Sequence, residues 1–225
     1  RTRIKICGLT RVEDIAAVVA AGADAIGFVF YPKSPRYVTP QQAASLIAAV
    51  PPYVTAVGLF VNATVDEVRA TRAVAPLSLL QFHGDETPEH SAALAGAVNT
   101  PFTQVFRVKP DTSFEDLLEY EQRYRAASPL FASLLLDTYV DAYGGAGKVF
   151  DWSLIPEELA PRVVLSGGLS VQNATDAVVR VRPYAVDISS GVEASKGIKD
   201  ASRVRAFIAA VQDADAIIAR GNHHE

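Results

Sequence analysis

The sequence predicts an α/β fold: a single-domain (β/α)8 barrel in which eight parallel strands are ringed by helices. Short apolar segments alternate with helical patterns eight times along the 225 residues, and this alternation is typical of a parallel sheet. The apolar segments are mostly continuous, as expected for strands buried on both faces. The length is close to the usual size of such a barrel, about 250 residues. An open doubly wound sheet is the alternative, but no Gly-x-Gly-x-x-Gly motif follows the first strand.

The strand segments are short, rich in Val, Ile, Leu and Phe, and most of them end at glycine, proline or a polar residue. They are expected at residues 4–7, 25–30, 55–61, 77–82, 104–108, 133–137, 163–165 and 184–188. A single domain covers residues 1–225, because no shift in composition marks a boundary. The tail is expected to fray from about residue 218.

Helix starts are marked by a capping box, in which Thr or Ser stands three residues before Glu or Gln. The pairs that fit this pattern are Thr10 with Glu13, Thr39 with Gln42 and Thr64 with Glu67, and Thr87 with Pro88 marks a fourth start. The first helix is expected over 11–21, where Gly22 ends it, the fifth over 114–127 and the last over 202–212.

Composition narrows the functional class. Lys and Arg number 21 against 25 Asp and Glu, for a net charge of -4, so we expect neither a nucleic-acid partner nor a charged tail. No apolar segment reaches membrane-spanning length, no signal peptide is seen, and no membrane partner is expected. The single cysteine cannot form an internal disulfide, which favours the reducing cytoplasm. The adjacent His223 and His224 are expected to be solvated rather than to bind metal.

In a barrel of this kind, polar groups at the carboxyl ends of the strands are the catalytic candidates. Those ends carry Cys7, Arg36 just after the second strand, His83, Arg107, Asp137, Ser166 with Gly167 and Gly168, and Asp187 with Ser189, Ser190 and Gly191. If the fold is right, they converge on one face.

Cys7 is the chain's only cysteine and stands where the first strand ends. A free cysteine is usually a small buried hydrophobic residue, but a thiol at a strand-to-helix turn is placed as a catalytic group is. Asp137 ends a buried strand, where burial would favour the protonated form and make it a possible acid. It is equally well read as a helix cap or as a partner of Lys5.

The glycine turns after the seventh and eighth strands stand where this fold usually binds phosphate. Glycine lets an anion approach backbone N–H groups, which favours a phosphate site; the alternative is that Gly167 and Gly168 only make a tight turn. The planar fork of Arg36 would suit a substrate carboxylate; the alternative is a solvated surface arginine. His83 either hydrogen-bonds to substrate or satisfies a buried loop. Lys148, in the long loop at 138–150, belongs either to a lid or to a flexible segment.

The chain resembles the phosphoribosylanthranilate isomerase family of tryptophan biosynthesis. The resemblance is carried, in order, by KICGLT at 5–10, GFVFYPKSPRYV at 27–38, VGLFVN at 57–62, LLQFHGDE at 79–86, LLLDT at 134–138, GGAGKVFDW at 144–152, LSGGL at 165–169 and VDISSGVE at 186–193. The family usually has threonine where Ala146 stands and leucine where Phe82 stands.

The resemblance implies an enzyme with a TIM-barrel fold that performs an Amadori rearrangement. N-(5-phosphoribosyl)anthranilate would become 1-(2-carboxyphenylamino)-1-deoxyribulose 5-phosphate. It further implies a phosphorylated aminosugar as the small-molecule partner, and no metal or organic cofactor; it defines no oligomeric state.

The same resemblance implies a role for each matching residue. Asp137 is the general acid that opens the ribose ring, and Cys7 is the general base that takes the C2 proton. Arg36 holds the anthranilate carboxylate. The phosphate-binding residues are Gly167, Gly168, Ser190 and Gly191. Outside this mapping, their places at strand ends make His83 and Asp187 further candidates for substrate binding.

Two other functions remain open. The related isomerase of histidine biosynthesis performs the same chemistry on a bulkier substrate with two phosphates, but typically has aspartate where Cys7 stands; dual-substrate isomerases also exist. A non-catalytic barrel that only binds a sugar phosphate is the alternative from another class, and it would need neither an acid nor a base.

Overall fold

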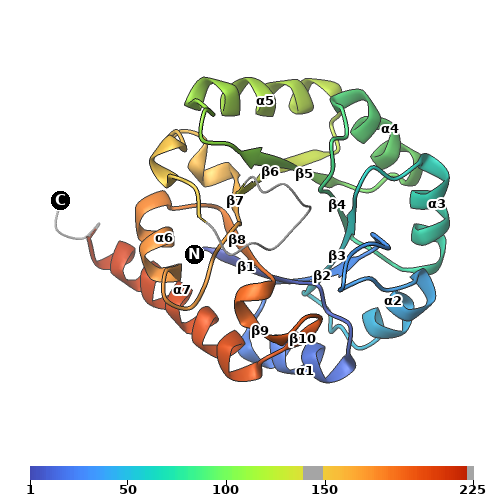
Figure 1. Cartoon of the computed structure of the whole chain (residues 1–225), viewed down its shortest axis with the longest axis horizontal. Helices are drawn as coiled ribbons and strands as arrows, with labels where there is room; N and C mark the ends of the chain where they lie inside the picture. Colours follow the sequence, from blue (N-terminus) through green and yellow to red (C-terminus); the bar gives the residue numbers. More distant parts are fainter. Residues whose placement is uncertain (139–148, 222–225) are drawn as a thin grey trace.

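The computed structural model describes residues 1–138 and 149–221. Its eight parallel strands form a closed barrel in chain order, with β1 paired to both β2 and β8 (Figure 1). The strands are β1 Arg3–Cys7, β2 Ala25–Val29, β3 Thr55–Phe60, β4 Leu79–Phe82, β5 Phe102–Val108, β6 Phe131–Thr138, β7 Val164–Leu165 and β8 Ala185–Ile188. The predicted barrel is confirmed, and the closing β1–β8 pair excludes an open sheet.

Helices surround the barrel (Figure 1). The described residues contain α1 Val12–Ala21, α2 Pro40–Ile47, α3 Val65–Val74, α4 Pro88–Val98, α5 Phe114–Ala127, α6 Ala174–Val181 and α7 Ala201–Gly221. Between β6 and β7 the described part has only two 3-10 turns, η1 Trp152–Leu154 and η2 Ala160–Arg162. The helical pattern predicted after this strand is therefore not found in residues 149–163, where Pro156 and Pro161 remove helical hydrogen bonds.

Most of the predicted helix starts are confirmed. Capping boxes are present at Thr39 and Thr64, and the Thr87 side chain accepts a hydrogen bond from the His90 N–H. The prediction for Thr10 is wrong: α1 has Arg11 at its N-cap, without a side-chain cap. The Thr10 hydroxyl instead donates a hydrogen bond to the carbonyl of Gly197 at 2.6 Å. It therefore bonds to a residue distant in sequence and not to the N-terminus of α1.

The last helix is longer than predicted. No glycine or proline interrupts α7 before Gly221, and Ala214 is buried beyond the expected end at residue 212. Residues 218–221, which were expected to fray, are helical; residues 222–225 lie outside the described part. In the described part, no helix combines the length and the apolar character needed to cross a membrane.

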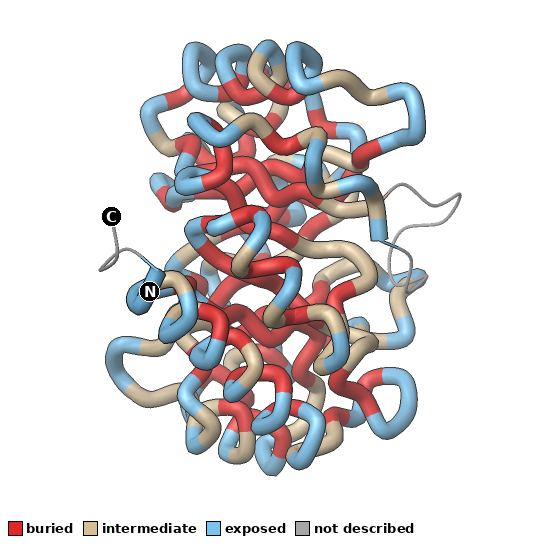
Figure 2. The backbone as a smooth tube through the Cα atoms, turned by 90° about the vertical axis from the view of Figure 1, so that its left-hand side faces the viewer, coloured by how far each residue is buried: buried red, intermediate tan, exposed pale blue. Residues whose placement is uncertain are grey.

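Buried residues run along the length of the barrel and the inner sides of the helices (Figure 2). The main core lies between the sheet and the helices, and a small separate cluster consists of Val105, Leu135, Val164 and Ala185. Polar side chains are also buried on the strands, among them Lys5, Gln81 and Asp187. Buried polar and charged groups need partners. Their presence inside the barrel therefore makes the barrel interior a candidate location for a functional site.

Candidate active site

One cavity at the carboxyl ends of the strands collects the predicted polar residues. It has a volume of about 100 Å³, and Cys7, Arg36, His83, Asp137 and Asp187 all line it. The remaining lining residues are Val29, Tyr31, Ser34, Leu59, Val61, Gln81 and Ser189. The sequence prediction that these side chains converge on one face therefore agrees with the structure.

Cys7 is 4% exposed at the end of β1 and lies near a buried ion pair. Lys5 and Asp187 face each other in the β1–β8 register, and their Nζ and Oδ1 atoms are 2.8 Å apart. Burial raises the pKa of the Cys7 thiol, and the attraction of its thiolate to Lys5 only partly offsets this effect. Burial alone would lower the pKa of Lys5, but Asp187 and Cys7 outweigh it, so the ammonium remains charged. Lys5 therefore supplies a fixed positive charge beside the thiol.

Asp137 is the penultimate residue of β6 and is held by a chain of hydrogen bonds. Its Oδ1 accepts from the Thr138 N–H at 2.8 Å, and its Oδ2 lies 3.1 Å from Nε2 of His83. Nδ1 of His83 lies in turn 3.1 Å from Nε2 of Gln81. Asp137 is thus paired with His83, and Lys5, the partner considered from the sequence, is paired with Asp187 instead.

Arg36 is anchored rather than solvated. Its Nε and Nη2 atoms donate to the two carboxylate oxygens of Glu193 at 2.7 and 2.8 Å, and Glu193 also accepts from Lys199 at 3.1 Å. Hydrogen bonding to Glu193 raises the pKa of Arg36. Gly8 makes this placement possible: its φ of 80° suits glycine, and a Cβ there would collide with Cδ of Arg36.

The glycine turns lie at the rim, outside the cavity lining. Gly167 and Gly168, after β7, have φ angles of 78° and 69°, and a Cβ on Gly167 would lie 2.6 Å from Oδ1 of Asp137. Ser190 and Gly191 lie in the 3-10 turn Ser190–Val192 after β8. Within the described residues, the N–H groups of Gly168, Ser190 and Gly191 donate no backbone hydrogen bond. These N–H groups are available to an anion.

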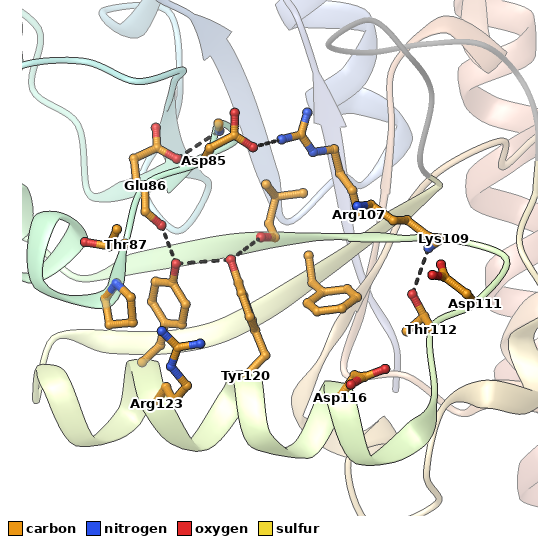
Figure 3. A pocket seen from close by; sticks show the side chains of 15 residues that line it. Asp85, Glu86, Thr87, Arg107, Lys109, Asp111, Thr112, Asp116, Tyr120 and Arg123 are labelled. Carbon is orange, nitrogen blue, oxygen red and sulfur yellow. Dashed lines mark hydrogen bonds and ion pairs between the residues drawn. The ribbon is translucent and has the colours of Figure 1, made fainter.

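Two larger cavities lined by described residues lie elsewhere. One, of about 730 Å³, lies between α5 and the ends of β4 and β5. In this cavity Arg107 points to Asp85, and the Tyr120 hydroxyl donates a hydrogen bond to the carbonyl of Val105 (Figure 3). The other, of about 660 Å³, lies at the amino ends of the strands. Neither is lined by Cys7 or Asp137, so the candidate active site is chosen by the chemistry of its side chains and not by its size.

Arg107 was a candidate because it stands near a strand end. It pairs with Asp85 and does not line the 100 Å³ cavity that contains Cys7 and Asp137. Lys148 and the glycines before it lie outside the described residues.

Sequence reasoning missed Glu193, Lys199 and Gln81. Gln81 precedes His83 by two positions, a spacing that places both on one face of the sheet, and this signal was available. Within the described residues, no group of three or more His, Cys, Asp and Glu could hold a metal ion.

Comparison with known proteins gives one consistent answer. A family model described as N-(5'phosphoribosyl)anthranilate (PRA) isomerase matches residues 4–210. An N-(5'-phosphoribosyl)anthranilate isomerase of Herminiimonas arsenicoxydans is 70% identical over 218 residues, which cover 97% of this chain and 96% of the relative.

Solved structures agree. Phosphoribosyl anthranilate isomerase from Thermotoga maritima superimposes with a TM-score of 0.83 at 40% identity, covering 95% of this chain and all of that one. A structure of phosphoribosyl anthranilate isomerase with reduced 1-(o-carboxyphenylamino)-1-deoxyribulose 5-phosphate has a TM-score of 0.80 at 37% identity, with coverage of 95% and 100%. The chain therefore belongs to the N-(5'-phosphoribosyl)anthranilate isomerase family.

Proposed function

We propose that the protein catalyses the Amadori rearrangement of N-(5-phosphoribosyl)anthranilate to 1-(2-carboxyphenylamino)-1-deoxyribulose 5-phosphate in tryptophan biosynthesis. The observation that carries this proposal is one cavity that exposes a thiol on β1 and a carboxyl group on β6. The complex with a reduced carboxyphenylamino-deoxyribulose phosphate in a family member supports a phosphorylated sugar as the substrate. We also place the enzyme in the cytoplasm, where its single thiol would stay reduced.

The order of the strands suggests how the substrate lies. Around the barrel, β7 and β8 separate Asp137 on β6 from Cys7 on β1, so the glycine turns lie between the acid and the base. A phosphate bound there would place the sugar between the two groups. Arg36, which follows β2 on the far side of Cys7, would then meet the anthranilate carboxylate through its planar fork.

In the first step, Asp137 gives its proton to the ribose ring oxygen. The C1–O bond breaks, its electron pair passes to the oxygen, and the anthranilate nitrogen forms a Schiff base with C1. In the second step, the Cys7 thiolate removes the proton from C2, and the electrons move toward the Schiff-base nitrogen. The enolamine then tautomerises to the ketose. The substrate's own nitrogen serves as the electron sink, so no cofactor takes part in this scheme.

Asp187 holds Lys5 beside the thiol, and we propose that it orients the base and meets substrate at the cavity wall.

The proposed function is tested by turnover. Purified enzyme is expected to convert N-(5-phosphoribosyl)anthranilate, followed by the loss of its fluorescence, and to leave the aminosugar of histidine biosynthesis largely unchanged. The presence of Cys7, where the histidine-pathway enzyme typically has aspartate, favours this preference. Equal turnover of both substrates would identify a dual-substrate isomerase, and turnover of neither would favour a binding protein.

Replacement of Arg36 tests the carboxylate contact. Arg36→Ala is expected to raise KM by roughly tenfold or more and to lower kcat less, because the ground and transition states share the lost interaction. Steady-state kinetics measures both constants. Arg11→Ala, which removes a half-exposed arginine paired with Asp14, is the control and should change neither constant. A lowered kcat with unchanged KM would assign Arg36 another role.

Inorganic phosphate tests the glycine turns. It is expected to inhibit competitively, and Gly168→Val should raise its inhibition constant by about tenfold or more, since the new side chain strains the turn and crowds the N–H groups. Gly22→Val is a matched control: Gly22 also has a positive φ, of 99°, but ends α1 with open space around it. Noncompetitive inhibition, or equal effects in the two variants, would place the anion elsewhere.

A further inference from the structure

A short hairpin after β8 holds a buried ammonium group that has no part in the proposed scheme. β9 Glu193–Ser195 and β10 Ile198–Lys199 pair antiparallel, with Lys199 opposite Glu193 (Figure 1). Gly197 lies in the turn between them at a φ of 79°, a conformation that favours glycine. The Lys199 side chain is 1% exposed and does not line the candidate active-site cavity. Lys199 can therefore act on a bound substrate only through its neighbours.

The Lys199 ammonium is held by hydrogen bonds. Its Nζ lies 3.1 Å from Oε1 of Glu193, 3.1 Å from the carbonyl oxygen of Ser189 and 3.4 Å from the Ser189 hydroxyl. Burial lowers the pKa of Lys199 from its ordinary value of 10.5, and the attraction and hydrogen bond of Glu193 oppose this decrease. Burial alone would raise the pKa of Glu193, but the hydrogen bond from Arg36 and the charge of Lys199 outweigh it. The ammonium and the carboxylate are therefore both charged at neutral pH.

Glu193 occupies one edge of the Arg36 guanidinium. Nε and Nη2 of Arg36 donate to its two carboxylate oxygens, while Nη1 has no hydrogen-bond partner among the described residues. Arg36 lines the cavity, whereas Glu193 does not. Taken alone, the Arg36–Glu193 pair is neutral and would attract a carboxylate weakly. With Lys199 the cluster contains two cations and one anion, so it carries a net positive charge.

The buried carboxylates beside this cluster have cations of their own. Asp187 pairs with Lys5 at 2.8 Å, and Asp14 pairs with Arg11 at 2.6 Å. Asp14 reaches the hairpin through a main-chain N–H of β10, at 2.9 Å. Because each of these pairs is neutral, the positive charge of the cluster is left for an anion. Charges interact more strongly in a buried site than in water, so this charge suits a substrate carboxylate at Arg36.

We propose that Lys199 is a positioning residue for the substrate carboxylate, because it offsets the charge of Glu193. Glu193 can then hold the Arg36 guanidinium in place without cancelling its attraction for an anion. Nη1 and the remaining N–H of Nη2 form an edge that can donate two parallel hydrogen bonds to a carboxylate. Lys199 itself contacts no substrate. This inference rests on the proposed function, in which Arg36 binds the anthranilate carboxylate.

Lys199→Met tests the proposal, because methionine has a similar length but carries no charge. Two ligands are compared by calorimetry: reduced 1-(o-carboxyphenylamino)-1-deoxyribulose 5-phosphate, which a family member binds, and the phenylamino analogue that lacks the carboxyl group. We expect the variant to bind the carboxylate ligand about tenfold or more weakly, and the analogue less than about threefold more weakly. A purely structural role would weaken the binding of both ligands equally. Thermal unfolding verifies the fold.

A second substitution separates charge from packing. When Glu193→Gln is combined with Lys199→Met, the cluster regains the net positive charge of Arg36, and the glutamine carbonyl can still accept from Nε. This double variant should bind the carboxylate ligand about threefold or more tightly than Lys199→Met alone. Lys196→Met is the matched control. Lys196 belongs to the same hairpin but is exposed, where water and salt screen its charge, so both ligands should bind as they do to the wild type.

The charge of Lys199 can also be measured in the wild-type enzyme, without any variant. Nitrogen-15 NMR is expected to show a charged ammonium at neutral pH. A neutral amine, equal weakening of both ligands by Lys199→Met, or a double variant that binds no better than Lys199→Met would overturn the role of Lys199. A wild-type enzyme that binds both ligands equally well would show that Arg36 does not contact the carboxylate, and would overturn that part of the proposed function together with the inference. The two failures are therefore distinguishable.

Discussion

Asp137→Asn is expected to lower turnover by roughly 100-fold or more while the barrel stays folded, because an amide cannot donate a carboxylic proton to the ring oxygen. Asparagine keeps the shape of the side chain, and its carbonyl oxygen can still accept from the Thr138 N–H, as Oδ1 of Asp137 does at 2.8 Å. Fluorescence-monitored turnover measures the loss, and thermal unfolding verifies the fold. KM should change much less than kcat, since the lost contribution belongs to the transition state.

The control for this substitution is Asp176→Asn. Asp176 forms an exposed ion pair with Arg180 on α6, with side chains 54% and 69% exposed. Exposed pairs of this kind contribute little to stability, so the variant should turn over at the wild-type rate. Near-normal turnover by Asp137→Asn would reject the acid assignment and leave His83 as the group to test.

The fold could be predicted from the sequence because each unit repeats a local signal. Continuous apolar strands and threonine caps such as Thr39 and Thr64 are local features, and the structure has them where they were predicted. Predictions became wrong where a distant group competed with the local one. The carbonyl of Gly197 takes the Thr10 hydroxyl that was expected to cap α1.

The location of the candidate site could also be predicted, because the carboxyl ends of all strands in a barrel meet on one face. The partners of each side chain could not, because they depend on register between strands far apart in sequence. Lys5 and Asp187 are neighbours only because β1 pairs with β8. Glu193 reaches Arg36 across 157 positions of the chain, and no local pattern indicates that contact.

The state of the Cys7 thiol gives a prediction about pH. A free thiol ionises near pH 8.5, and burial raises the pKa of Cys7 in spite of the nearby Lys5. Because only the thiolate reacts with iodoacetamide, the rate of inactivation should rise with pH and reach its midpoint above about 8.5. Cys7 is the chain's only cysteine, so no other thiol can account for the loss of activity. A midpoint below about 8.5 would show that Lys5 outweighs burial.

Cys7→Ser is expected to lower turnover by roughly 100- to 10,000-fold with little change in ligand affinity. Serine preserves the size of the side chain, but its hydroxyl is far too weakly acidic to supply the base that removes the C2 proton. Affinity can be measured with reduced 1-(o-carboxyphenylamino)-1-deoxyribulose 5-phosphate, the ligand bound to a family member. The same ligand should protect the wild-type enzyme from alkylation, since Cys7 lines the cavity that we assign to substrate. The residual activity of Cys7→Ser should be insensitive to iodoacetamide, which controls for modification at other side chains. Wild-type turnover by Cys7→Ser or by the fully alkylated enzyme would make Cys7 a packing residue and exclude the proposed base.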